Sequence, residues 1–161
     1  MAEFNKYKQL LNDGEYASAE KILSGLSVKE VTFLPSVVSH TIYDELWHTT
    51  IWQNIVIYSE DNKALNNEVY AKWKQGEVYP KVQINTQQDW DDLVKEFLTG
   101  INKAIATGQN PETLQRKVEG QTFTIGDAIE ILATHNAYHL GKIVALRQYQ
   151  GCWPPKDNLA P

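Results

Sequence analysis

The stretch TFTIGDAIEILATHNAYHLGKIVALRQYQG, residues 122–151, decides the fold more clearly than any other part of the sequence. Thr124 is an N-cap residue, and Asp127 three positions later predicts a capping box at the start of a helix. Gly151, followed by a Pro-Pro pair, predicts its end. Between these signals one side chain in every three or four belongs to a single helical face more than five turns long. That face comprises Ile125, Ala128, Leu132, His135, His139, Ile143 and Leu146.

Other segments repeat the same helical period. A second helix is predicted over residues 41–59, a third over 86–108, and a shorter one over 15–27, with a further helical stretch over 3–11. The residues between them, 60–85 and 109–123, are predicted as connections. KVQIN (81–85) alternates too briefly for a strand. The sequence therefore predicts an all-α protein, a four-helix bundle with a long crossover connection between the second and third helices.

Length and composition fit one globular domain. The 161 residues are 42% hydrophobic and 22% charged, and we expect a single domain over 1–161, with an N-terminal extension over about 1–14 and a C-terminal tail over 152–161. The net charge of -5 and the absence of a basic stripe argue against nucleic-acid binding.

Features of secreted and membrane proteins are not visible in the sequence. The first residues lack the apolar core of a signal peptide, and no run of about 18 apolar residues predicts a membrane span. Cys152 is the single cysteine, so the chain cannot form a disulfide within itself. We therefore expect a cytoplasmic protein.

His135 and His139 replace apolar residues in the buried stripe. Residues four apart on a helix point the same way, so two imidazoles there can bind one metal at about 2.1 Å. The alternative is a pair of structural histidines with hydrogen-bond partners. His48 lies on the inward face of the 41–59 helix, beside Trp52. Three neutral imidazoles would leave one coordination position open, which is typical of catalytic rather than structural metal sites.

Five nearby residues have less specific interpretations. We expect His40 to be exposed or to act as a cap partner. Asp44 suits the N-terminus of its helix, and Glu45 could orient a histidine ring or accept a proton. Trp52 and Tyr138 could wall a pocket, but core filling is the favoured interpretation for both.

The segments HTIYDELWHTTIWQ (40–53) and TIGDAIEILATHNAYHLGKIVALRQYQGCWPP (124–155) together resemble the DinB-like superfamily, which includes YfiT-type and related metal-dependent hydrolases. The pattern is a one-histidine helix followed much later by H-N-x-x-H-x-G-[QK]-I-x-x-x-R, and the similarity covers about residues 16–155. The resemblance implies an up-down-down-up four-helix bundle and a three-histidine site for one divalent metal, zinc or nickel. The implied ligands are His48, His135 and His139.

The resemblance also implies a class of chemistry. Relatives include thiol S-transferases that use bacillithiol or mycothiol, and a mycothiol-dependent isomerase. The first hypothesis is therefore a metal-dependent enzyme, a thiol S-transferase or a hydrolase, with a small-molecule substrate and a low-molecular-weight thiol. The alternatives are a non-catalytic metal-binding or stress-related binding module, and a structural bundle with hydrogen-bonded histidines. Relatives in this superfamily and the general frequency of symmetric dimers among oligomers lead us to expect a homodimer.

Four other positions of the last helix and its end have expected structural roles. Asn136 should bond to backbone or to a neighbouring helix, and Arg147 should pair with a carboxylate. Gly141 should permit close helix approach, because glycine inside a helix otherwise costs about 1 kcal/mol. Cys152 lies beyond the helix end and should be neither ligand nor nucleophile.

Overall fold

The computed structural model describes residues 5–58, 71, 75–118 and 121–155. Part of the predicted 60–85 connection, including its expected helical turn, lies outside the described residues. No β-strand occurs in the described part, only an isolated antiparallel bridge between Lys117 and Thr124. This confirms the predicted all-α class. The helices are α1 Lys6–Leu11, α2 Ala19–Leu23, α3 Val28–Val31, α4 Ile42–Tyr58, α6 Gln87–Thr107, α7 Pro111–Gln115 and α8 Ile125–Tyr149.

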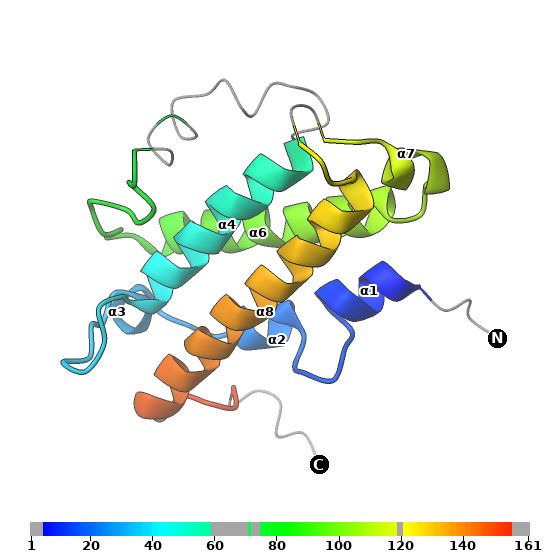
Figure 1. The fold of residues 1–161 in the computed structure, drawn as a ribbon. Coiled ribbons are helices and arrows are strands. Elements are labelled where there is room, and N and C mark those ends of the chain that lie inside the picture. Colours follow the sequence, from blue (N-terminus) through cyan, green and yellow to red (C-terminus); the bar gives the residue numbers. More distant parts are fainter. Residues whose placement is uncertain (1–4, 59–70, 72–74, 119–120, 156–161) are drawn as a thin grey trace, which may run out of the picture.

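Three long helices and one pair of short helices form the bundle (Figure 1). Helices α4 and α8 pack side by side and run in opposite directions, while α6 packs against α4 and runs in the same direction as α4. The short helices α1 and α2 pack against both α6 and α8 and occupy the fourth position. The chain passes through them in the direction that α8 later takes, which gives the expected up-down-down-up order.

The parallel course of α4 and α6 explains the long crossover. A 17-residue helix such as α4 is about 25 Å long at 1.5 Å per residue. Neighbouring helices that run in the same direction cannot be joined by a short turn, because the chain must first return along that length. Residues 59–86 make this connection.

The N-terminal ends of α4 and α8 are each fixed by a reciprocal pair of hydrogen bonds. At α8, the Thr124 side chain accepts from the Asp127 N–H and the Asp127 carboxylate accepts from the Thr124 N–H, as the sequence predicted. Thr41 and Asp44 make the same exchange at the start of α4, at 2.8 and 3.0 Å. Gly151 follows α8 with a positive φ of 71°, which glycine adopts without strain. Local sequence therefore sets the register of both helices.

The N-terminal region departs from the predicted 15–27 helix. The Ser18 side chain caps α2, Gly25 ends it with a φ of 67°, and Ser27 with Glu30 forms a capping box that starts α3. Two serine caps and one glycine thus divide residues 15–27 between two short helices. A serine side chain that bonds to the backbone competes with the helical hydrogen bonds, so a helix begins at each serine and does not continue through it. The predicted 109–123 connection likewise contains the short helix α7, which Asn110 caps.

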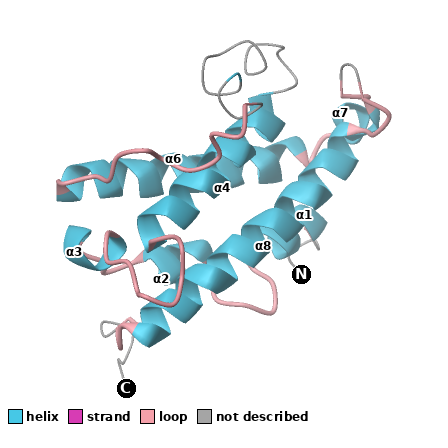
Figure 2. Cartoon of the chain, turned by 60° about the vertical axis from the view of Figure 1, so that its left-hand side comes forward, coloured by secondary structure: helices cyan, strands magenta, loops and turns pink. Residues whose placement is uncertain are grey.

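The core lies where α4, α6 and α8 meet the short N-terminal helices. Each long helix contributes its apolar stripe, and the side chains that are almost fully buried include Leu11, Ile42, Leu46, Phe97, Ile101, Leu132, Leu140 and Ile143. Figure 2 shows α4 and α8 from a second direction, with the loops outside the helices. Among the described helices, none is both long and apolar enough to cross a lipid bilayer.

Close approach of two helices depends on a different glycine from the one expected. Gly141 is exposed, and a Cβ built on it would meet nothing within 4 Å. The predicted role of Gly141 is therefore wrong, because this position faces solvent. Gly100 of α6 is buried against α4, where a Cβ would overlap the side-chain amide of Gln53.

Candidate metal centre

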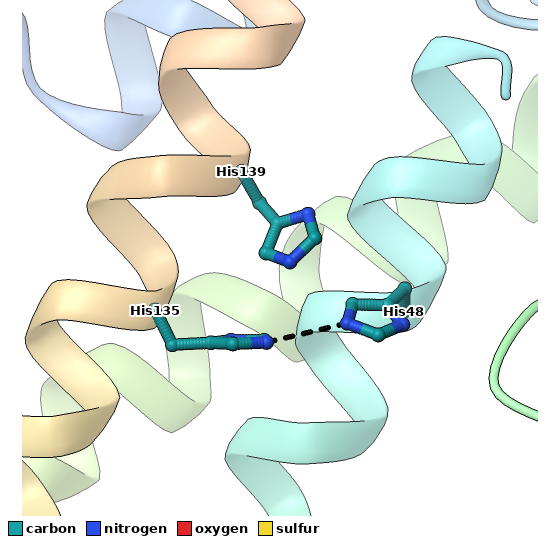
Figure 3. A group of neighbouring side chains, drawn as sticks. All are labelled: His48, His135 and His139. Carbon is teal, nitrogen blue, oxygen red and sulfur yellow. Dashed lines mark hydrogen bonds between the residues drawn. The ribbon is translucent and has the colours of Figure 1, made fainter. Parts of the chain in front are cut away.

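Three histidines converge between α4 and α8 (Figure 3). His48 comes from α4, and His135 and His139 come from successive turns of α8. Their ring centroids lie 5.2 Å apart for His48 and His135, and 4.5 Å apart for each of the other two pairs. One ring nitrogen from each residue lies within 4.8 Å of the other two. The structure therefore brings together the three residues that the sequence singled out, and they are called the histidine cluster below.

The outward nitrogens of two rings are held by strong acceptors. The Nδ1 of His48 lies 2.8 Å from the Val78 carbonyl oxygen, and the Nδ1 of His139 lies 2.6 Å from the carboxylate of Glu45. A carbonyl and a carboxylate can only accept, so each Nδ1 carries the proton. Neutral rings of this tautomer have their lone pair on Nε2, which is the atom left for a metal.

The third ring is oriented by a hydroxyl. The Nδ1 of His135 lies 3.4 Å from the Thr49 Oγ1, and that hydroxyl donates to the Asn136 Oδ1 at 2.9 Å. Asn136 in turn donates to Gln53, whose amide donates to the Phe97 carbonyl of α6. We call Thr49, Asn136 and Gln53 the amide network. Because its hydroxyl proton is directed to Asn136, the Thr49 oxygen faces His135 as an acceptor, at a longer distance than the partners of the other two rings.

The resulting arrangement places the Nε2 atoms of two rings against each other. They are 3.2 Å apart, the contact drawn as a dashed line in Figure 3. At that distance one ring can donate a hydrogen bond to the other, or both nitrogens can bind one cation. Metal–nitrogen bonds of about 2.1 Å separate neighbouring ligand atoms by about 3.0 Å in octahedral and about 3.4 Å in tetrahedral geometry. The spacing of these two nitrogens therefore fits a shared divalent ion.

Burial keeps two of the rings neutral. It lowers the pKa of His135 to about 4, with further lowering by the neighbouring charges of His139 and His48. Burial also lowers the pKa of His48, although its bond to Val78 opposes this. Metals bind the deprotonated imidazole. His48 and His135 are therefore in their ligand form at neutral pH.

Glu45 orients His139, and its hydrogen bonds make it a weaker base than a free carboxylate. It is 1% exposed, and its two oxygens accept hydrogen bonds from His139 and from Lys142. Burial favours the protonated acid, but these two hydrogen bonds outweigh it and lower the pKa of the carboxyl. Of the two roles considered for Glu45, the geometry supports orienting a ring. Asp44 instead accepts from the Thr41 N–H at the start of α4, as predicted.

Two residues of the 75–86 segment belong to the centre and were missed. Val78 supplies the carbonyl for His48, and Tyr79 stacks between His40 and His48, with centroids 3.6 and 4.7 Å away. Burial, followed by the charge of Glu45, raises the pKa of Tyr79 to about 12. His40 is half-buried in this stack and is not a cap, which corrects its predicted role. No periodicity marks this segment, so no sequence pattern pointed to these two residues.

The two aromatic residues considered as pocket walls differ from each other. Trp52 is half-buried and packs against the core, as predicted, and its ring also lies 5.6 Å from the His135 ring. Tyr138 does not fill the core, because it is 63% exposed and lies edge-on to His139 at 4.9 Å. Helical facing explains this, since Tyr138 precedes the buried His139 by a single residue and points outward.

Asn136 and Arg147 have structural roles, one as predicted and one not. Asn136 joins α8 to α4 through the amide network. Arg147 is 1% exposed, and its guanidinium donates to the carbonyl oxygens of Ile22, Ser24 and Cys152. The predicted carboxylate partner is therefore wrong. Carbonyls at the ends of short segments serve as acceptors because helices leave their last C=O groups unpaired. Cys152 is outside the histidine cluster, as expected.

The fold and the site define a helical bundle with a three-histidine centre between two antiparallel helices. The family model of the DinB superfamily matches residues 12–143, which is more than half of the chain. The chain belongs to the DinB superfamily. Neither curated proteins nor solved structures gave a significant match.

Proposed function

We propose that this protein binds one divalent metal ion through His48, His135 and His139. The observation that carries the proposal is the convergence of three rings, with one nitrogen of each within 4.8 Å of the other two. Val78 and Glu45 accept from the opposite nitrogens of His48 and His139. Three nitrogen ligands with an open position suit zinc, and imidazole also suits nickel. Membership of the superfamily supports the same assignment.

Metal analysis of the purified protein tests this proposal. We expect one zinc or nickel ion per chain, and His139→Ala should abolish stoichiometric binding while the helical circular dichroism stays nearly unchanged. His40→Ala is the matched control, because His40 stacks on Tyr79 but lies outside the histidine cluster. Retention of one ion per chain with unchanged affinity in His139→Ala would show that the site is wrong.

We also propose that the protein is a metal-dependent thiol S-transferase, in preference to a hydrolase. When bound, a divalent cation with an open position lowers the pKa of a thiol or a water, so that a nucleophile exists at neutral pH. Hydrolysis additionally needs a base, and the hydrogen bonds from His139 and Lys142 lower the pKa of Glu45 and so weaken it as a base. Tyr79, whose ring stacks on His48, stays protonated near neutral pH and is not a base either.

The proposed reaction is a substitution at carbon. The thiol gives its proton to solvent, the sulfur electron pair forms the new S–C bond, and the leaving group departs with the electrons of its own bond to carbon. The test is a screen of low-molecular-weight thiols with an electrophile, such as a bimane halide, on zinc-loaded and nickel-loaded protein. Conversion above the thiol-only rate, lost in His139→Ala, supports catalysis.

Absence of conversion in a metal-loaded sample would favour the alternative, a non-catalytic metal-binding module. Metal content is measured on the same sample, so a failed reaction cannot be confused with a failed site. The homodimer and the cytoplasmic location stay predictions. Light scattering at tens of micromolar protein tests the first.

A further inference from the structure

A groove of about 440 Å³ lies beside the histidine cluster, between the C-terminal half of α8 and the segment that precedes α4. Its volume is within the range of small-molecule sites, about 300–1,000 Å³. The walls come from two elements far apart in sequence. Residues 35–40 form one side, and the α8 face with Lys142, Leu146 and Tyr149 forms the other.

One end of the groove is polar and reaches Glu45, the residue that orients His139. Glu45 lines the groove and also accepts from the His139 Nδ1, while Lys142 donates to the second oxygen of Glu45. The Lys142 side chain is 35% exposed. An ammonium group has three donors, so Lys142 can bind a further acceptor in the groove while it stays paired with Glu45.

The rest of the groove is apolar and open to solvent. Val37 is 75% exposed and Tyr149 is 58% exposed. Val37 lies with Val38 on one wall of the groove, and Tyr149 lies with Ala145 on the other. Exposed apolar side chains that gather in one concave place indicate a ligand or partner site. The α8 wall also continues the helical face of His139, since positions 139, 142, 146 and 149 follow at steps of three and four.

We propose that this groove binds the substrate of the metal centre, and that the substrate has an apolar body and an anionic group. This inference rests on the proposed function. The apolar body lies along Val37, Ala145 and Tyr149, and the anionic group contacts Lys142 at the end next to His139. The charge at that end and the continuity with the centre favour a small amphiphile over a second copy of the chain.

Two probes of equal length test the charge and the apolar body separately. Octanoate and 1-octanol are titrated into zinc-loaded protein by calorimetry, and we expect octanoate to bind about tenfold more tightly. Lys142→Gln should reduce octanoate binding to the level of octanol. Ala145→Trp fills the groove from an exposed helical position and should abolish binding of both probes, whereas Gln148→Trp, an exposed position one turn away outside the groove, should change neither.

A second groove variant keeps the proposal testable if Ala145→Trp does not fold. Val37→Asp places a negative charge in an exposed loop and should weaken octanoate more than octanol. Equal affinities of the two probes for wild type, or octanoate binding that survives both groove variants, would overturn the proposal. It would also be overturned if wild type bound neither probe and Ala145→Trp converted a dimer to a monomer, because the groove would then be a contact between copies.

The zinc content of each sample separates the two proposals. Zinc bound at one ion per chain without octanoate binding refutes the groove and leaves the metal centre intact. The expected octanoate pattern in a protein that never binds metal supports the ligand class and refutes the proposed function.

Discussion

Two clusters of polar side chains cross the same α4–α8 interface, and they differ in how their hydrogen bonds end. In the amide network, each donor is aimed at an acceptor and the series finishes on the backbone carbonyl of Phe97. In the histidine cluster, Val78 and Glu45 accept from the outward nitrogens of His48 and His139, but the inward nitrogens of His48 and His135 meet only each other, at 3.2 Å.

The difference separates a structural cluster from a functional one. Both clusters carry the cost of burying polar groups, and hydrogen bonds offset that cost only where donors meet acceptors. The amide network is complete within the protein and fixes the relative position of three helices. The histidine cluster instead brings one nitrogen of each ring within 4.8 Å of the others, an arrangement that could hold a cation, which makes it the candidate for function.

Truncation of the amide network should have the largest effect on stability. Gln53→Ala leaves the Asn136 amide and the Phe97 carbonyl without their partner and opens a cavity against Gly100. We expect the free energy of unfolding to fall by about 2–4 kcal/mol, with one metal ion still bound per chain. Urea denaturation and metal analysis measure the two effects. If Gln53→Ala lost metal binding but kept its stability, the amide network would serve the metal site rather than the fold.

Acid should distinguish the two clusters, because only one of them titrates. The pKa of His135 is lowered to about 4 in the folded protein, against about 6.5 in the unfolded chain. Between these values the unfolded chain binds a proton that the folded protein does not, so stability rises with pH. The contribution is complete above pH 6.5 and is lost as pH falls toward 4, by up to about 3 kcal/mol.

The measurement is denaturation of metal-free protein between pH 4 and 7, with His135→Ala as the reference. The wild type should lose more stability across this range than the variant. If the free energy of unfolding changed with pH equally in the wild type and in His135→Ala, His135 would not be held neutral in the folded protein. Because the pKa values of His48 and His135 are lowered, protons should displace the metal from these rings only at a pH below 6.5, the value expected from free imidazole.

Removal of the charge behind His139 should weaken the metal site without breaking it. Glu45→Gln keeps the size of the side chain but loses the carboxylate that accepts from the ring. We expect metal affinity to fall about tenfold to a hundredfold, as measured by competition with a chelator. Asp44→Asn is the matched control, because this neighbouring carboxylate caps α4 and should leave affinity unchanged. An equal loss in both variants would assign the effect to helix stability.

Two glycine-to-alanine changes should act in opposite directions, and the one at the exposed position should give the smallest effect. Gly141→Ala adds a methyl group to an exposed helix position and should raise stability by about 0.5–1 kcal/mol. Gly100→Ala forces Gln53 out of the amide network and should lower stability. Thermal unfolding measures both. Destabilisation by Gly141→Ala would restore the contact role predicted from the sequence.

The helices of the periodic segments could be predicted from the sequence because their signals are local. The capping box of Thr124 and Asp127, the stripe of α8 and the positions of His135 and His139 follow from spacing along one helix. The inward face of His48 followed in the same way from α4. The Asn110-Pro111 signal for α7 was present and overlooked, since asparagine is a good N-cap and proline suits the first helical position.

By itself, the sequence determined which helices form and which side chains lie on their buried faces, because helical period and capping act over a few residues. Tertiary structure alone decided what those side chains meet. Val78 and Tyr79 reach His48 from a connection without periodicity, and Gln53 meets Phe97 across two helices. Arg147 finds carbonyls rather than a carboxylate for the same reason. Such partners depend on how distant segments pack, and no local pattern records that.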